Sequence, residues 1–299
     1  MTTGVSLAAA AAAAIVGLLV SRAAPRVLLA AIVLAAIAAL IAAMHVLAGG
    51  ADWEWRSAVS IAGEPLHLRL DGISALFMTL LCVVGASGAV YSHEYWPQRA
   101  HPRSAVAGRA WWSVLLISLA LVLLVANGLH FLVAWELFTL ASYFLVTLER
   151  QARDVRSAGW LYLTVSHAAL LALIAFFTLL ACRTGSWDLG PMQDKPQVAP
   201  LFWLMLFGFG IKAGAFPLHI WLPSAHANAP SHVSAIMSGV VIKMGIYGLV
   251  RFTGWMPVPA GAGWVVATLG VASAVFGVAF ALGQHDLKRL LAYHSVENI

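Results

Sequence analysis

The sequence predicts an all-α polytopic membrane protein with about nine transmembrane helices, the start of a tenth, and a break in the seventh. The composition is the first reason: 62% of the 299 residues are hydrophobic, only 10% are charged, and mean hydropathy is +0.88. A soluble protein of this length carries about twice that share of charge. The second reason is that the apolar residues gather in runs of about 20, long enough to cross ~30 Å of hydrocarbon as helices. Open strands would leave unpaired backbone groups in lipid, so these spans are expected to be helical.

The apolar runs define the spans in order along the chain. We predict spans over residues 4–21, 26–48, 72–92, 110–127, 129–148, 157–182, 200–217, 232–253 and 262–283, and a tenth segment that begins at Leu290. The first run lacks the preceding basic residues of a signal peptide, because its basic residue, Arg22, follows it; we therefore expect a retained helix rather than a cleaved leader. Between the second and third spans, residues 49–71 are expected to form a small hairpin turning at residues 63–65.

The seventh span ends in the stretch GIKAGAFPLHIWLPSAHANAPSH, residues 210–232. Pro217, Pro223 and Pro230 lack backbone donors and interrupt helices, so a bend or unwinding is expected within residues 213–230. Irregular backbone at membrane depth is tolerated only against protein or water. A break beside Lys212 therefore predicts a hydrated polar pocket.

The basic residues predict the orientation. Counted together with residues near the span ends, loops after odd-numbered spans hold ten of them and loops after even-numbered spans hold five. This asymmetry predicts cytoplasmic odd loops and an N-terminus outside. Two basic residues, Lys212 and Lys243, remain, and both lie inside spans, as does the acidic residue Glu136.

The composition also argues against several functions. The net charge of +5 is spread over loops, without the basic run and interleaved aromatics expected of a nucleic-acid-binding protein. Cys82 and Cys182 lie in apolar segments, outside any CxxC motif, and are expected to be small buried side chains. Because an iron–sulfur cluster usually needs four thiolates, we expect no metal, redox centre or other cofactor on this chain.

Charges in the middle of spans are costly, at least ~2.5–3.5 kcal/mol each. Glu136 and Lys212 have opposite charge and similar expected depth, so we predict that their charged groups lie within ~10 Å of each other. Glu136, Lys212 and Lys243 are the candidate proton-translocation residues. The alternative for each is a side chain that extends its charge to the membrane surface, or a structural ion pair.

Histidines can pass protons near neutral pH. His167 in the sixth span and His219 in the broken segment are the first candidate relays, with an interior hydrogen-bonded role as the alternative for each. His294 and Glu297, in the unfinished tenth segment, are further candidates.

Three segments carry a resemblance to a known family: WELFTLASYFL, GIKAGAFPLHIWLPSAHANAPSHVSAIMSGVVIKMGIYGLVRF and QHDLKRLLAYHSVENI. They resemble the antiporter-like subunits of respiratory complex I, Mrp-type cation/proton antiporters and the membrane subunits of group 4 hydrogenases. The ending LLAYHSVENI resembles hydrogenase-4 component B and the corresponding formate hydrogenlyase subunit in particular. The resemblance covers at least residues 66–299.

The resemblance implies one antiporter-like domain over 1–299, the N-terminal half of such a subunit. Its first inverted repeat would span 110–253, and a second would begin near 262 and remain incomplete. In the family, residues matching Glu136 and Lys212 form the gating pair of a proton half-channel, and the lysine matching Lys243 lies on a central polar axis. The chain is then expected to be a fragment, a truncated product or half of a split subunit.

The function implied is proton translocation in a hydrogenase-4, formate hydrogenlyase or NADH:quinone oxidoreductase-like complex. Other membrane subunits and a peripheral redox arm would be its partners, in the cell inner (plasma) membrane, with Na⁺ left open as the ion. One alternative is a subunit of an Mrp-type cation/proton antiporter without redox partners. Another is a truncated scaffold that moves no ions.

Overall fold

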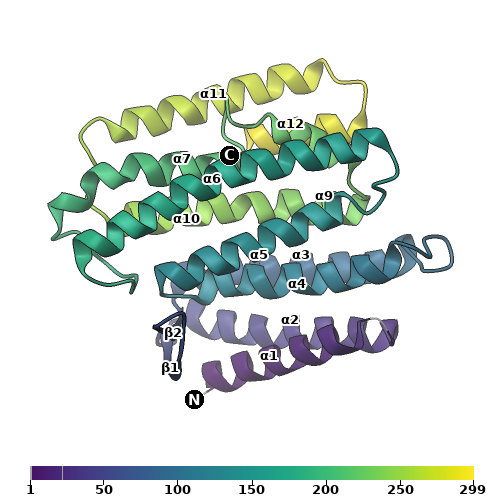
Figure 1. Ribbon diagram of the computed structural model, residues 1–299, viewed down its shortest axis with the longest axis horizontal. Coiled ribbons are helices and arrows are strands. Elements are labelled where there is room, and N and C mark those ends of the chain that lie inside the picture. The colour runs from purple at the N-terminus through teal and green to yellow at the C-terminus, as the bar shows by residue number, and fades with distance from the viewer. Residues whose placement is uncertain (1, 22) are drawn as a thin grey trace. The chain divides into compact units, whose positions relative to one another are not determined.

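The computed structural model describes residues 2–21 and 23–299, so Met1 and Arg22 lie outside the described residues. Figure 1 shows a chain made almost entirely of long helices with one small hairpin. The helices are α1 (Thr2–Val20), α2 (Pro25–Leu47), α3 (Gly72–Tyr95), α4 (Ala105–Leu124), α5 (Gly128–Val146), α6 (Arg153–Thr184), α7 (Phe202–Ala213), α8 (Trp221–Asn228), α9 (Ser231–Ile236), α10 (Ile242–Trp255), α11 (Ala262–Leu282) and α12 (Leu287–Glu297). A 3₁₀ turn, Pro196–Leu201, precedes α7, and a π-helical segment, Met237–Val241, joins α9 to α10.

The predicted fold class is confirmed. Among the described residues, nine helical segments are long and apolar enough to cross a membrane. Helix α12 corresponds to the tenth segment, which was expected to begin at Leu290. Several helices extend beyond the apolar runs: α4 begins at Ala105 rather than 110, and α6 covers 153–184 rather than 157–182. Hydropathy marks only the part of a helix that suits lipid, while its hydrogen bonding continues into the polar interface. The N-outside orientation stays a prediction, and Arg22, counted for it, lies outside the described residues.

Several helix ends follow directly from single polar or glycine residues. The side chain of Asp71 accepts a hydrogen bond from the first turn of α3, Asn127 does so for α5, and Asp286 for α12. These oxygens satisfy amide donors that a helix start leaves open. Gly185 and Gly214 end α6 and α7 with φ of 79° and 82°, the left-handed conformation that glycine adopts without steric cost.

The predicted hairpin is confirmed. Strands β1 (Trp53–Ile61) and β2 (Glu64–Leu70) pair antiparallel, with a register irregularity between Arg56 and Ser60. The turn lies at Ala62 and Gly63, both with positive φ, one residue earlier than expected. Two successive positive φ values match the twist of paired strands, so a two-residue turn suffices.

Hydrogen bonds attach this hairpin to the turn between α4 and α5. The carbonyl of His67 accepts a bond from the amide of Ala126 at 2.9 Å, and the His130 ring contacts the carbonyl of Ile61 at 3.0 Å. The His67 ring also bonds the carboxylate of Glu54 at 2.7 Å, which lowers the pKa of Glu54 below its ordinary value. The hairpin is therefore attached to one end of these helices.

The helices form two compact units. The first comprises the described residues up to Glu149 with Pro230–Val240, and the second comprises Arg150–Ala229 with Val241–Ile299. In the second unit, Phe252 of α10 packs edge-on against Phe176 and Phe177 of α6 and stacks on Phe209 of α7, with centroid distances of 5.2, 5.4 and 5.7 Å. This aromatic cluster fixes α6, α7 and α10 around the segment that carries Lys212.

The predicted break of the seventh span is confirmed. Helix α7 ends at Ala213, the chain turns through 215–220, and α8 begins at Trp221. Pro217 lies in the turn, Pro223 in the first turn of α8, and Pro230 immediately before α9. The first turn of a helix tolerates proline because its amides have no intrahelical acceptor.

Two features differ from the sequence-based expectation. The eighth span contains the π-helical segment Met237–Val241, which no proline marks. A π turn needs only one additional residue in an otherwise regular helix, so the apolar pattern continues through it.

Cys82 is buried as expected, but the prediction for Cys182 was wrong: its side chain is exposed on α6.

Candidate functional site

Lys212 lies in the last turn of α7 and is 1% exposed. Its ammonium donates to the hydroxyl of Tyr162 at 2.8 Å and to that of Ser166 at 3.4 Å, and it lies 4.7 Å from the centre of the Tyr162 ring. Tyr162 and Ser166 are four residues apart on α6, so both face the lysine. The α6–α7 contact therefore forms a polar site inside an apolar bundle.

The chemistry of this site suits a group that changes charge. The negative end of the α7 dipole and the face of the Tyr162 ring both favour the charged lysine. A tyrosine hydroxyl can accept a hydrogen bond from an ammonium or donate one to a neutral amine. Tyr162 can therefore stay hydrogen-bonded to Lys212 in either protonation state.

The backbone freed by the break finds protein partners. The amides of Gly214 and Ala215 bond the carbonyl of Gly210, and the Trp221 indole donates to the carbonyl of Ile211 at 3.0 Å. The amide of Phe216 donates to Ser273 of α11 at 2.9 Å. These donors and carbonyls therefore have partners within the protein, and the expected hydrated pocket beside Lys212 stays a prediction.

A cavity of about 390 Å³ lies beside the break, within the second unit. Apolar side chains dominate its lining, among them Phe207, Phe216 and Leu249, and Lys212 does not line it. The polar groups of the break thus point into protein, while its open side is apolar.

Lys243 lies in the first turn of α10, two residues beyond the π-helical segment, and is half-buried. Two residues further along the same helix, Gly245 lies against the backbone of α7. A Cβ at Gly245 would come within 2.6 Å of the Phe209 carbonyl oxygen and would also meet the Ala213 amide. Helix α10 can therefore approach the end of α7 only because residue 245 is glycine.

The candidate histidines have different surroundings. His219 lies in the turn after α7, is 8% exposed, and stacks on Phe216 with 5.2 Å between ring centres. Tyr293 of α12 lies 6.1 Å from it. His167 follows Ser166 on α6 and is half-buried, about 100° around the helix from the face that meets Lys212.

His294 and Glu297 are brought together near the end of α12. The His294 ring nitrogen Nδ1 lies 2.8 Å from a Glu297 carboxylate oxygen, as expected for residues three apart on a helix. The His294 side chain is 46% exposed and Glu297 is 27% exposed. The structure thus pairs two predicted relay residues, with the histidine facing outward.

Glu136 lies in the middle of α5, is half-buried, and belongs to the first unit, whereas Lys212 belongs to the second. The predicted approach of their charged groups therefore stays a prediction. Sequence reasoning missed Tyr162 and Ser166 as partners of Lys212. The available signal was their four-residue spacing on an otherwise apolar span, but tyrosine and serine are common in such helices.

Comparison of the sequence with known proteins identifies the family of this chain. Residues 125–299 match the transmembrane family described as NADH:quinone oxidoreductase/Mrp antiporter. Hydrogenase-4 component B of Escherichia coli (strain K12) is 36% identical over 242 residues, covering 78% of this chain and 36% of that protein. The chain spans roughly a third of the length of the first curated relatives it matches.

Two solved structures share the fold over nearly the whole chain. The membrane-bound sulfane sulfur reductase, an archaeal respiratory membrane complex, contains a chain with TM-score 0.82 and 19% identity, matched over 99% of this chain and 62% of that one. The Mrp complex from Dietzia sp. DQ12-45-1b contains one with TM-score 0.81 and 27% identity, covering 99% of this chain and 33% of that one.

Proposed function

Because the chain belongs to the NADH:quinone oxidoreductase/Mrp antiporter transmembrane family, we propose that it forms part of a proton-translocating membrane subunit. The subunit serves a hydrogenase-4, formate hydrogenlyase or NADH:quinone oxidoreductase-like complex, and partner chains carry the redox chemistry. The similarity to hydrogenase-4 component B supports the first of these assemblies. The subunit lies in the plasma membrane with its N-terminus outside, as the basic loops favour.

The single observation that supports this function best is the environment of Lys212. A lysine 1% exposed, whose ammonium donates to two hydroxyls at a helix end, can gain and lose a proton while these two hydroxyls stay hydrogen-bonded to it. Lysine is suited to this because its ammonium titrates more readily than a guanidinium when buried. In the proposed mechanism Lys212 carries the proton.

Glu136 is the gating partner of Lys212 in this proposal. When its carboxylate approaches, it favours the protonated lysine, and when it withdraws, the lysine releases its proton. Lys243 receives the proton on the next helix, and His167, His219, His294 and Glu297 are the candidate connections to water. The resemblance to the family, together with the mid-span positions of the three charged residues, supports these roles.

Lys212→Arg in the full-length subunit, within its assembled complex, tests the proton carrier. Arginine keeps the charge but does not release its proton at accessible pH. We expect redox turnover with artificial acceptors to persist while proton uptake into inverted vesicles falls at least tenfold. Lys195→Arg, the same change in the loop before the 3₁₀ turn, is the matched control. Full pumping by an assembled Lys212→Arg complex would contradict the carrier role.

The Mrp-type alternative is supported by the 27% identity to a chain of the Dietzia Mrp complex. It predicts cation/proton exchange that a Na⁺ gradient drives without any electron donor. The same vesicles, energised by Na⁺ instead of substrate, separate the two functions. A scaffold that moves no ions predicts that Lys212→Ala alters assembly alone.

A further inference from the structure

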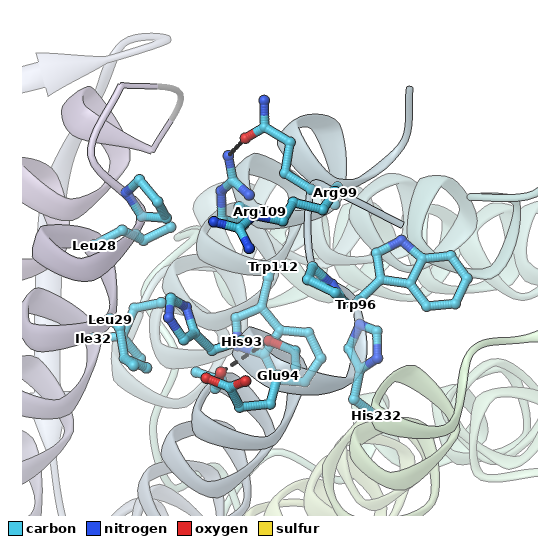
Figure 2. A pocket seen from close by; sticks show the side chains of 17 residues that line it. Leu28, Leu29, Ile32, His93, Glu94, Trp96, Arg99, Arg109, Trp112 and His232 are labelled. Carbon is cyan, nitrogen blue, oxygen red and sulfur yellow. Dashed lines mark hydrogen bonds between the residues drawn. The ribbon is translucent and has the colours of Figure 1, made fainter. Parts of the chain in front are cut away.

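A cavity of about 360 Å³ opens at one end of the first unit, where the start of α2, the end of α3 and the start of α4 meet. These ends belong to the loops after the first and third spans, so all lie on one side of the membrane. Figure 2 shows the cavity, with the side chain of His232 entering from the start of α9. The cavity therefore lies at the level where helices leave the lipid.

Two arginines give this cavity a positive charge. Arg109 donates to the backbone carbonyl of Ser21 at 3.2 Å and to the side-chain oxygen of Gln98 at 3.1 Å, both neutral acceptors. Arg99, on the loop before α4, also lines the cavity, and Figure 2 shows both arginines at the same end of it. Glu94 is the lining carboxylate, so the two arginines and Glu94 leave a net charge of about +1.

Two buried polar side chains in the lining have an atom without a protein hydrogen bond. The Trp112 indole nitrogen and the His232 Nδ1 find no acceptor or donor among the described residues, although these side chains are only 3% and 5% exposed. Buried polar atoms are rarely left unsatisfied in folded proteins. The two side chains line the same cavity, so a molecule bound there would supply the missing hydrogen-bond partners of both atoms.

A second, apolar cavity lies next to this polar one. This cavity, of about 180 Å³, runs among α1, α2, α3 and α4, and Ile32 lines both. Alanines of α1 and α2, including Ala10, Ala14, Ala36 and Ala39, form much of its wall. Small side chains at these positions leave room for the second cavity between the helices, beside the polar one.

We propose that this adjacent pair of cavities binds one anionic phospholipid. Its phosphate lies at Arg99 and Arg109, which match phosphate oxygens in geometry and charge. The Trp112 indole donates to a headgroup or ester oxygen, and an acyl chain enters the alanine-lined cavity beyond Ile32. The net positive lining favours an anionic headgroup over a zwitterionic one. The basic loops place the site on the leaflet predicted to be cytoplasmic, where anionic lipids attract basic groups.

The test uses the full-length subunit in its complex, stripped of lipid and titrated with dioleoylphosphatidylglycerol, with native mass spectrometry counting the lipid bound. Wild type is expected to hold one tight lipid on this chain. Arg99→Gln should weaken binding about fivefold, since one arginine near a charged membrane surface contributes on that scale. Arg103→Gln, the same change on the same loop outside this cavity, is the matched control.

A second pair of variants tests the apolar cavity without removing charge. Ala36→Phe fills this cavity and should weaken dioleoylphosphatidylglycerol binding, whereas Ala30→Phe, on the exposed side of α2, should not. Inorganic phosphate should compete only weakly with the lipid.

Four outcomes would overturn the proposal. The first is that wild type binds no lipid tightly, and the second is that Arg103→Gln and Arg99→Gln weaken lipid binding equally. The third is that Ala36→Phe leaves lipid binding unchanged, and the fourth is that dioleoylphosphatidylcholine binds as tightly as dioleoylphosphatidylglycerol. Effective competition by inorganic phosphate together with full binding to Ala36→Phe would identify a phosphate site instead.

Discussion

The seventh and eighth spans place a lysine in apolar surroundings by different means. The seventh ends outright at Ala213, with Gly214 in the left-handed conformation, and buries Lys212 against two hydroxyls. The eighth stays helical from Ser231 to Trp255, widens into a π turn, and leaves Lys243 half-buried. Complete burial of the cation accompanies a helix terminus, whose dipole favours positive charge. The unbroken helix has no such terminus at Lys243, and its lysine stays partly exposed.

The two spans depend on each other through Gly245, which gives the largest expected effect. Gly245→Leu would drive a side chain into the Phe209 and Ala213 backbone, and overpacking of this kind costs about 3 kcal/mol or more. We expect loss of the assembled subunit in membranes, measured by immunoblot and size-exclusion chromatography. Gly254→Leu, on the same helix where a Cβ meets nothing within 4 Å, should assemble normally. Normal assembly of Gly245→Leu would show that the α7–α10 contact is not fixed.

Neutral replacement of each lysine sharpens the comparison between buried and half-buried cations. Lys212→Met should abolish proton translocation with little change in the thermal unfolding temperature, because avoiding the cost of burying a charge offsets the hydrogen bonds lost at Tyr162 and Ser166. Lys243→Met should also impair translocation but leave stability within about 0.5 kcal/mol, as at partly exposed sites. Vesicle proton uptake and thermal unfolding in detergent measure both. A destabilised Lys212→Met protein would indicate a structural role for the lysine.

Removing one hydroxyl tests how Lys212 is held. Tyr162→Phe keeps the ring beside the lysine and deletes the 2.8 Å hydrogen bond, at a cost of about 1–3 kcal/mol for a buried charged donor. Proton translocation should slow severalfold, with redox turnover through artificial acceptors unchanged. Tyr91→Phe, on an exposed position of α3, is the control. Unaltered translocation and stability in Tyr162→Phe would remove tyrosine from the proposed mechanism.

The smallest effects distinguish the glycine that ends α7 from one inside it. Gly214→Ala places a Cβ on a residue with φ of 82°, 3.2 Å from a methyl of Leu222, and should destabilise by about 1–2 kcal/mol. Gly210→Ala meets nothing within 4 Å and should stabilise α7 by up to about 1 kcal/mol. Denaturant titration of the purified complex measures both signs. Equal effects would mean that the end of α7 is not set by its left-handed glycine.

The fold was more predictable from sequence than the site. Apolar runs revealed the spans because lipid demands a nearly continuous apolar surface, and Pro217 and Pro223 revealed the break because proline cannot donate a backbone hydrogen bond. Lys212 was identifiable from its cost in lipid alone. Its partners were not: Tyr162 and Ser166 fit an apolar helix without any visible cost, and only packing shows which face of α6 meets the lysine.

The same limit explains why the π-helical segment of the eighth span was not predicted. A π turn arises where neighbouring helices fix the positions on either side of one surplus residue, so tertiary packing rather than local sequence decides where it forms. The exposed Cys182 has a related cause: within an apolar helix of a membrane protein, hydropathy does not separate the face that meets protein from the face that meets lipid.

The π turn changes the phase of the helix that contains it. A helical wheel advances about 100° per residue, and a π turn takes in one more residue than an α-helical turn. A wheel drawn through Met237–Val241 therefore loses its register there. Positions in α10 that are chosen for mutation or cross-linking by the i+3 and i+4 spacing from α9 would therefore lie on a different face of the helix from the one intended. The correct count restarts at Ile242.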